Sequence, residues 1–255
     1  MLYLNERRRL GLKFDEFCFV DDYKACASDA DISTILFCKN QPEVPSKAKS
    51  NMGIDLRKEP EEIFAGFSSS MRQDIRRAMR DDEYVIERQE KPSFTEIESF
   101  CKYFNVFSRQ KGIYTLQAKQ LMPFVEKDAF TLTKAMSREN GATLYMMTYI
   151  RDESRVSAFH GCSHFRSAKG SIARKLAQAN KYLQYQNMLY FRDEGRSLYD
   201  LGGYYEDENN EPVSGIDKFK KGFGGEKFLE YSFFYPRTAK GKLFLKLRPR
   251  DHGKL

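Results

Sequence analysis

The sequence lacks the features that mark membrane-spanning, secreted and zinc-binding proteins. No apolar run approaches the roughly 18 residues of a transmembrane helix; the best one, Leu144 to Ile150, is far shorter. The N-terminus lacks the basic-then-apolar order of a signal peptide. The five cysteines are widely spaced and form no C-x-x-C pair, which argues against a zinc site and a disulfide framework. We therefore expect a cytoplasmic protein without a bound metal.

Tryptophan is also absent, but other aromatic residues are abundant. The 255 residues include 21 Phe and 15 Tyr and are 41% hydrophobic, which is ample for a packed core. The net charge of +7 favours an anionic partner: phosphate, nucleic acid or a membrane surface. However, the 36 acidic residues are interspersed among the 43 basic ones, whereas a dedicated nucleic-acid binder usually segregates its charges more sharply.

The chain length allows one large domain, or one domain with a smaller lobe. Two apolar, β-prone runs at residues 14–20 and 32–38 precede a segment with two prolines and two lysines, 42–50, which has the composition of an exposed connection. We expect a small N-terminal lobe of strands and loops at 1–53, and a larger domain with a basic C-terminal tail at 54–255.

Patterns in the larger domain predict helices, then three strands in series, then alternating helices and strands. Ser93 and Glu96 have the spacing of a capping box, and Asn140-Gly141 is a strong hairpin signal. In chain order we expect helices at 59–67, 68–81, 93–111 and 116–127; strands at 130–137, 143–150 and 156–165; a helix at 174–194; a strand at 197–204; a short helix at 215–221; and a strand at 228–235.

Two glycine-rich stretches, Tyr199–Gly203 and Gly215–Gly225, lie in the last third of the chain. Glycine is used where the backbone needs a positive φ or where another molecule approaches the main chain closely. Lysines beside such a backbone indicate a site for an anion, or for negative charge that develops during a reaction. A tight turn with solvated lysines explains the same residues.

The order of elements from about residue 93 resembles the GNAT acyltransferase fold. Ser70–Ala78 resembles the R-x-x-I-R-x-A helix of Fem-type peptidoglycan aminoacyltransferases and their single-domain relatives. Later stretches resemble further signatures of that group: Arg174 with Asn180–Leu183, Tyr199–Gly203, and Phe219–Gly224. The resemblance covers about residues 54–235. It implies an α+β fold with a GNAT-like mixed, mostly antiparallel sheet flanked by helices, and a FemAB-like acyltransferase of peptidoglycan or surface-polysaccharide biosynthesis.

Two departures from the family pattern bear on the acyl donor. The glycine loop that GNAT enzymes use for acetyl-CoA is missing, since residues 167–171 contain one glycine. The chain is also shorter than the two-lobed Fem enzymes and shows no long coiled-coil arm, which weighs against aminoacyl-tRNA. An acyl-CoA or acyl carrier protein thioester is the easier fit as co-substrate, with no tightly bound cofactor; tRNA stays open.

Acyl transfer to an amine requires a positioned donor, a stabilised oxyanion and a route for protons. His160 is the leading general base because histidine titrates near neutral pH, and Asp200 can orient the amine or act as the base. Tyr204 can protonate a departing thiolate. Lys220, which matches the lysine of the family's F-K-x-G-F-G motif, can neutralise negative charge. Each residue also has a structural explanation, as a hydrogen-bonded strand histidine, a turn aspartate, a surface tyrosine and a solvated lysine.

Binding residues are expected at two further places. A helix N-terminus attracts anions, and the donor-binding candidates near it and in the double-glycine strand are Lys169, Gly170, Ser171, Arg174, Gly202 and Gly203. On the helix at 68–81, guanidinium groups at four-residue spacing suit a phosphorylated acceptor; these are Arg72, Arg76 and Arg80. A solvated helix face, paired with nearby aspartates, is the favoured explanation of the three arginines.

The combined evidence predicts an N-acyltransferase that moves an acyl group from a thioester to the amine of an amino sugar or similar acceptor in cell-surface glycan biosynthesis. The acceptor is expected to be a small molecule or a nucleotide- or lipid-linked amino sugar. Three alternatives stay open: aminoacyl-tRNA-dependent transfer to a peptidoglycan precursor, a basic nucleic-acid-binding module, and an inactive GNAT scaffold. Whether the chain forms a homodimer is also open.

Overall fold

The structure, a computed structural model, describes residues 1–163 and 170–247. The chain forms two compact units. Unit 1 combines Met1–Asn51 with Phe228–Leu255, and unit 2 is Met52–Lys227. The C-terminal part therefore groups with the N-terminal segment, whereas the sequence analysis assigned it to the larger domain. Within the described ranges, no helix combines the length and the apolar character needed to cross a membrane.

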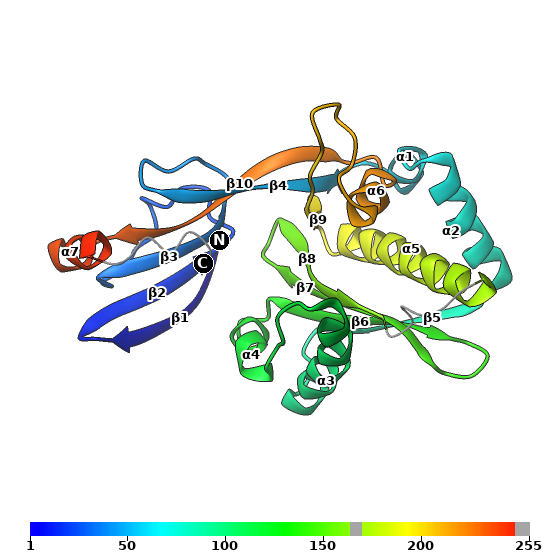
Figure 1. The fold of residues 1–255 in the computed structure, drawn as a ribbon, viewed down its shortest axis with the longest axis horizontal. Helices are drawn as coiled ribbons and strands as arrows, with labels where there is room; N and C mark the ends of the chain where they lie inside the picture. Colours follow the sequence, from blue (N-terminus) through cyan, green and yellow to red (C-terminus); the bar gives the residue numbers. More distant parts are fainter. Residues whose placement is uncertain (164–169, 248–255) are drawn as a thin grey trace. The chain divides into compact units, whose positions relative to one another are not determined.

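Unit 1 is a small sheet with one helix (Figure 1). Its strands follow the order β1-β2-β3-β10. The β2–β3 pair is parallel, and the other two pairs are antiparallel. The bounds are β1 Leu2–Arg9, β2 Leu12–Cys18, β3 Ile32–Cys38, β10 Glu226–Pro236 and α7 Ala239–Leu247. The sequence patterns did not predict β1, because Leu4 is its one buried residue and three exposed arginines end it.

Unit 2 has a sheet in the order β4-β9-β8-β7-β6-β5 (Figure 1). Strands β5 to β8 pair antiparallel in series, and β9 is parallel to β8. The bounds are β4 Ser46–Asp55, α1 Pro60–Ala65, α2 Ser69–Asp81, β5 Tyr84–Gln89, α3 Phe94–Lys111, α4 Ala118–Glu126, β6 Phe130–Ser137, β7 Thr143–Arg151, β8 Arg155–Cys162, α5 Gly170–Asp193, β9 Leu198–Gly203 and α6 Gly215–Lys221. This arrangement confirms the predicted GNAT-like mixed, mostly antiparallel sheet flanked by helices.

Local sequence signals set several element ends. Ser68 caps α2, and Ser93 with Glu96 forms the predicted capping box of α3. Gly112 ends α3 in the left-handed conformation, with φ 65°. Two segments differ from the prediction: residues 46–50, expected as a connection, begin strand β4, and β5 was not predicted.

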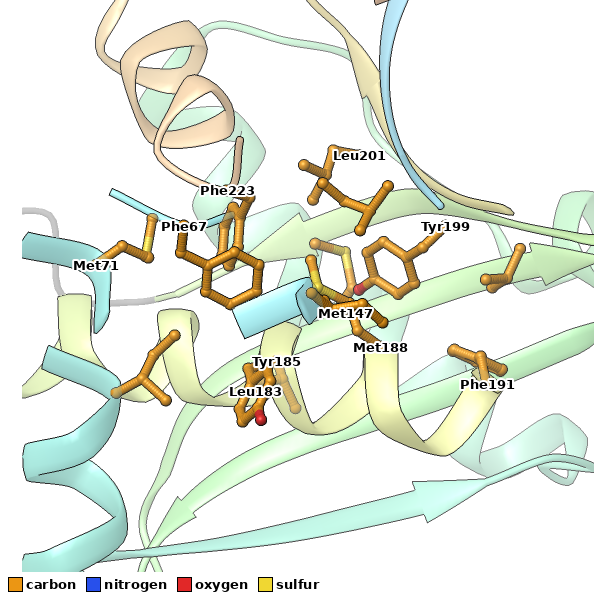
Figure 2. Packing of buried hydrophobic residues seen from close by; sticks show 14 of the residues in the cluster. Phe67, Met71, Met147, Leu183, Tyr185, Met188, Phe191, Tyr199, Leu201 and Phe223 are labelled. Carbon is orange, nitrogen blue, oxygen red and sulfur yellow. The ribbon is translucent and has the colours of Figure 1, made fainter. Parts of the chain in front are cut away.

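The core of unit 2 lies between the sheet and α5 (Figure 2). Its apolar side chains come from α1, α2, α5, the strands and two connecting segments, since Phe67 lies between α1 and α2 and Phe223 follows α6. Other members include Met71, Met147, Leu183, Met188, Phe191 and Leu201. A fully buried polar cluster crosses this core, in which the Tyr199 hydroxyl donates to Tyr149 Oη at 2.8 Å and Asn187 Nδ2 donates to the same atom at 2.9 Å. Such a cluster fixes the register of α5 on the sheet.

Gly224, in the F-K-x-G-F-G stretch, is required for close backbone packing. Its φ is +66°, and a Cβ there would collide with the Gly66 carbonyl after α1. We expect Gly224→Ala to lower the free energy of unfolding by about 2–4 kcal/mol, because left-handed strain adds to overpacking. Gly215→Ala is the matched control, since its Cβ would enter open space at the start of α6; it should change stability by less than about 1 kcal/mol. Urea unfolding measures both, and equal stability of the two variants would contradict the packing argument.

Candidate functional site

Strands β8 and β9 pair over only part of their length. Their parallel register joins Arg155–Ser157 to Leu198–Asp200 and goes no further. Beyond it β8 continues to Cys162 and β9 to Gly203. We call these continuations, Ala158–Cys162 and Leu201–Gly203, the unpaired ends, because they are not paired with each other.

A bulge in β8 lies within the same stretch. On β7, Thr148 pairs with His160 and Tyr149 pairs with Ala158, so Phe159 is the extra residue. A bulge bends its strand and increases the local twist. The bend therefore coincides with the point at which β8 stops pairing with β9.

The carboxylate of Asp200 lies where the pairing ends. Its Oδ2 accepts hydrogen bonds from the Arg155 guanidinium and from Ser157 Oγ, at 2.6 Å in the second case, and both donors are on β8. Its Oδ1 accepts the backbone N–H of Gly202 at 2.7 Å. Asp200 is fully buried. One side chain thus joins β8 to β9 and holds an N–H group that regular pairing would have used.

The double-glycine strand brings Lys220 into the same place. Gly202 has φ +80°, and a Cβ on it would lie 3.5 Å from the Ala158 carbonyl oxygen and 3.7 Å from Lys220 Nζ. Lys220, from α6, donates from Nζ to the Gly203 carbonyl at 2.5 Å. A chain of contacts therefore links four of the residues proposed from the sequence: Asp200 binds Gly202, and Lys220 lies beside Gly202 and binds Gly203.

His160 lies on β8 in an aromatic pocket on the opposite face of the sheet from α5. Its ring packs against Phe104 of α3 at 5.5 Å between centroids, and its Nδ1 is hydrogen-bonded to the Tyr114 hydroxyl at 3.1 Å. Burial lowers the pKa of His160 from 6.5 to about 4. The imidazole is therefore neutral at pH 7, and Tyr114, which is 60% exposed, lies between it and solvent.

Tyr204 is buried and already has a partner. Its hydroxyl donates to Glu206 Oε1 at 2.6 Å, and Glu206 forms an ion pair with Lys227 at 2.5 Å. Burial and the Glu206 carboxylate raise the pKa of Tyr204 above its ordinary value. The phenol is thus held in an internal hydrogen-bond chain.

The three arginines of α2 make contacts within unit 2. Arg72 donates to the carbonyls of Ala65, at 2.8 Å, and Phe67. The Arg76 guanidinium lies 5.2 Å from the centre of the Phe64 ring, and Arg80 pairs with Asp81 at 2.7 Å. Arg72 thereby satisfies carbonyls at the end of α1, while the other two lie on an exposed face.

The start of α5 lies beside an open cavity with a volume of about 530 Å³. Gly170, Ser171 and Arg174 are exposed at this end of α5 but do not line the cavity, and the expected donor ligand Lys169 is outside the described residues. The acidic lining residues outnumber the basic ones: Asp81, Asp82, Glu83 and Glu139 against Arg138 and Lys175. Ion pairs join Arg138 to Asp82 at 2.9 Å and Lys175 to Glu83 at 3.3 Å. The surroundings of this helix N-terminus thus favour a polyphosphate less than the sequence suggested.

Sequence reasoning missed three residues of this region: Arg155, Ser157 and Tyr114. Arg155 and Ser157 occupy alternate positions of one strand and so share a face, but only knowledge of the β8–β9 register would have placed them opposite Asp200. Tyr114 is in the loop between α3 and α4, and no local pattern distinguishes it from other exposed tyrosines.

Similar solved structures have the same fold. FemX aligns with a TM-score of 0.57 at 15% identity, over 78% of this chain and 63% of FemX. The C-terminal domain of a protein named as a lysylphosphatidylglycerol synthetase from Agrobacterium fabrum aligns with a TM-score of 0.54 at 13% identity, over 96% of this chain and 82% of that one. L-PGS from Bacillus licheniformis aligns with a TM-score of 0.53 at 13% identity, over 84% of this chain and 71% of L-PGS.

These likenesses establish a Fem-type GNAT fold for the chain, which spans less than two thirds of FemX. No protein-family model and no curated protein matches the sequence.

Removing the charge of Asp200 should destabilise the protein strongly. Asp200→Asn leaves the Arg155 guanidinium buried beside a neutral amide, so we expect the free energy of unfolding to fall by about 3–5 kcal/mol. The control is Asp81→Asn, which breaks the exposed pair with Arg80 and should leave stability nearly unchanged. Chemical unfolding measures both. Similar stability of the two variants would contradict the expectation that a buried Arg155 guanidinium without the Asp200 charge is costly.

The stability of the protein should depend on pH through His160. The folded-state pKa, about 4, lies below the unfolded value of 6.5, so the unfolded state binds the proton more tightly. The contribution of His160 to the free energy of unfolding is therefore fully present above pH 6.5. It falls, by up to about 3 kcal/mol, as the pH decreases towards 4. His160→Gln should flatten this part of the profile, whereas Tyr114→Phe, which keeps the imidazole, should retain it. An unchanged profile in His160→Gln would contradict the assignment.

Proposed function

We propose that the protein is an acyltransferase that transfers an acyl or aminoacyl group to an amine at the unpaired ends of β8 and β9. The observation that carries this proposal is the coincidence of three features: the end of β8–β9 pairing, two glycines whose main chain carries no side chain, and a lysine ammonium at that main chain. A thioester or ester arm can add to such strand ends as a further extended segment.

Lys220 is the residue we assign to the developing negative charge. When an amine attacks an activated carbonyl, the carbonyl oxygen becomes an oxyanion, and an ammonium already fixed in position stabilises it. The contact with Gly203 holds Lys220 Nζ at the end of β9. The backbone of Gly202 and Gly203 borders the acyl group without side chains in the way.

Asp200 acts in this proposal as a positioning residue. Both carboxylate oxygens are engaged within the protein, and the residue is fully buried. An incoming amine would have to displace Arg155, Ser157 or Gly202 to reach it. Its role is to fix the point at which β9 leaves β8.

His160 is assigned to proton transfer with a specific pH signature. A base with a pKa of about 4 gives a rate that rises through pH 4 and is flat above it. An ordinary histidine would instead give a rate that rises near pH 6.5. A buried imidazole of low basicity also accepts a proton more readily from the strongly acidic ammonium of a tetrahedral intermediate than from a free alkylammonium.

The donor is either a thioester, as the missing coiled-coil arm suggested, or an aminoacyl ester. Acyl-CoA carries several negative charges, which the acidic surface beside α5 disfavours. One of the similar structures is a domain of a protein named as a lysylphosphatidylglycerol synthetase. These two observations favour an aminoacyl donor over CoA, with a carrier-protein thioester as the other donor to test. The acceptor remains the amine of a surface-glycan precursor, and Arg76 and Arg80 are the exposed groups of α2 able to contact its phosphate.

Lys220→Ala should reduce turnover by about 100- to 1,000-fold, as for loss of one oxyanion-stabilising group. Lys218→Ala is the matched control, because it removes an exposed lysine of the same helix, and it should retain turnover. One assay combines acyl-CoA or acyl carrier protein with nucleotide-linked amino sugars and measures the released thiol. A second replaces the donor with aminoacyl-tRNA and measures ester loss above spontaneous hydrolysis.

The outcomes distinguish the proposals. Acceptor-dependent thiol release supports the thioester donor, and acceptor-dependent ester loss supports the aminoacyl donor. Consumption of neither donor overturns acyl transfer, and steep salt-sensitive binding of RNA in that case would favour a nucleic-acid-binding module. Equal activity of Lys220→Ala and Lys218→Ala would remove Lys220 from the mechanism.

A further inference from the structure

Helix α7 of unit 1 exposes apolar side chains that no part of the described unit covers. Phe244 and Leu245 pack towards the sheet, with Phe244 6.0 Å from Phe14 between ring centres. Leu243 and Leu247, four residues apart and so on one side of the helix, are 58% and 76% exposed. The helix is therefore apolar both where it contacts the sheet and on a second, exposed side.

A third exposed leucine belongs to the same region. Leu10, in the turn between β1 and β2, is 76% exposed, and its neighbour Gly11 accepts a hydrogen bond from Lys240 Nζ of α7. That contact connects the turn to the helix. The three leucines thus lie on adjacent elements of one unit.

Basic side chains surround these leucines. Lys240, Lys242 and Lys246 are exposed on α7. Strand register adds two more: Arg7 pairs with Phe14 and Arg9 with Leu12, and directly opposed residues of antiparallel strands share a face. Phe14 and Leu12 contact α7 residues within one apolar cluster, so the two arginines are on the α7 side of the sheet. From Tyr231 to Leu247 the sequence contains no acidic residue.

We infer that this face, formed by Leu10, Leu243 and Leu247 with the surrounding lysines and arginines, binds the surface of an anionic phospholipid membrane. Exposed leucines enter the interfacial region of a bilayer, while lysines and arginines contact the anionic headgroups. This combination of exposed leucines and basic side chains favours a lipid partner over nucleic acid, because leucine neither stacks on bases nor forms hydrogen bonds with them. The inference is independent of the acyltransferase proposal.

Vesicle co-sedimentation tests this inference directly. The full chain should bind vesicles of phosphatidylcholine mixed with phosphatidylglycerol, bind phosphatidylcholine alone much more weakly, and lose affinity as salt is raised. Leu243→Gln/Leu247→Gln leaves the charge unchanged and should weaken binding by about tenfold or more. Lys242→Gln/Lys246→Gln should also weaken it and reduce its salt dependence.

The matched control is Leu229→Gln, which changes a leucine of similar exposure, 53%, on β10. It should bind as the unchanged protein does, and thermal melting should show that all variants are folded. Absence of vesicle binding would overturn the inference, and so would equal binding by Leu229→Gln and Leu243→Gln/Leu247→Gln. So would a dimer in light scattering that dissociates in Leu243→Gln/Leu247→Gln, because the face would then bind a second copy of the chain.

Discussion

The buried carboxylate of Asp200 is the constraint on which the candidate site depends. A buried ion pair contributes little net stability, because desolvating two charges offsets their attraction. Asp200 instead determines where the pairing of β8 and β9 ends. One oxygen of its carboxylate binds Arg155 on β8, and the other accepts the N–H group of Gly202. Strand pairing therefore stops at a defined residue, and the bulge at Phe159 bends β8 at the same level. A hydrophobic pair of equal volume could hold the strands together but could not bind that N–H group.

Ending a ladder inside a sheet leaves backbone groups that need other partners. The protein supplies one with Lys220, which donates to the Gly203 carbonyl. Glycines at this position, with Gly202 in the left-handed region, leave the main chain without side chains. The same elements therefore explain how the strand end keeps a hydrogen-bond partner where its pairing with β8 has stopped.

The sequence predicted those parts of the fold that local signals determine. The capping box at Ser93, the terminating Gly112 and the hairpin at Asn140-Gly141 all act within a few residues, and the α3 helix and the β6–β8 strands followed from them. Strands β1 and β5 were missed because their side chains show little apolar alternation. For the candidate site, the glycine and lysine motifs predicted Lys220 and Gly202, and the structure places these two residues side by side. The sequence could not predict the contact of Arg155 with Asp200, because the two residues are 45 positions apart and their contact depends on strand order.

The charge differs between the two places where the sequence predicted anion binding or charge neutralisation. Lys220 supplies positive charge at the end of β9, whereas the cavity beside the start of α5 is lined by more acidic than basic residues. A donor rich in phosphate would gain from the first and be repelled by the second. A cationic aminoacyl donor would not be repelled by the acidic lining, so within the proposal the charge distribution favours it over CoA. Lys220 would stabilise the same oxyanion for a thioester and for an aminoacyl ester, because the attacked carbonyl carbon becomes tetrahedral in both cases.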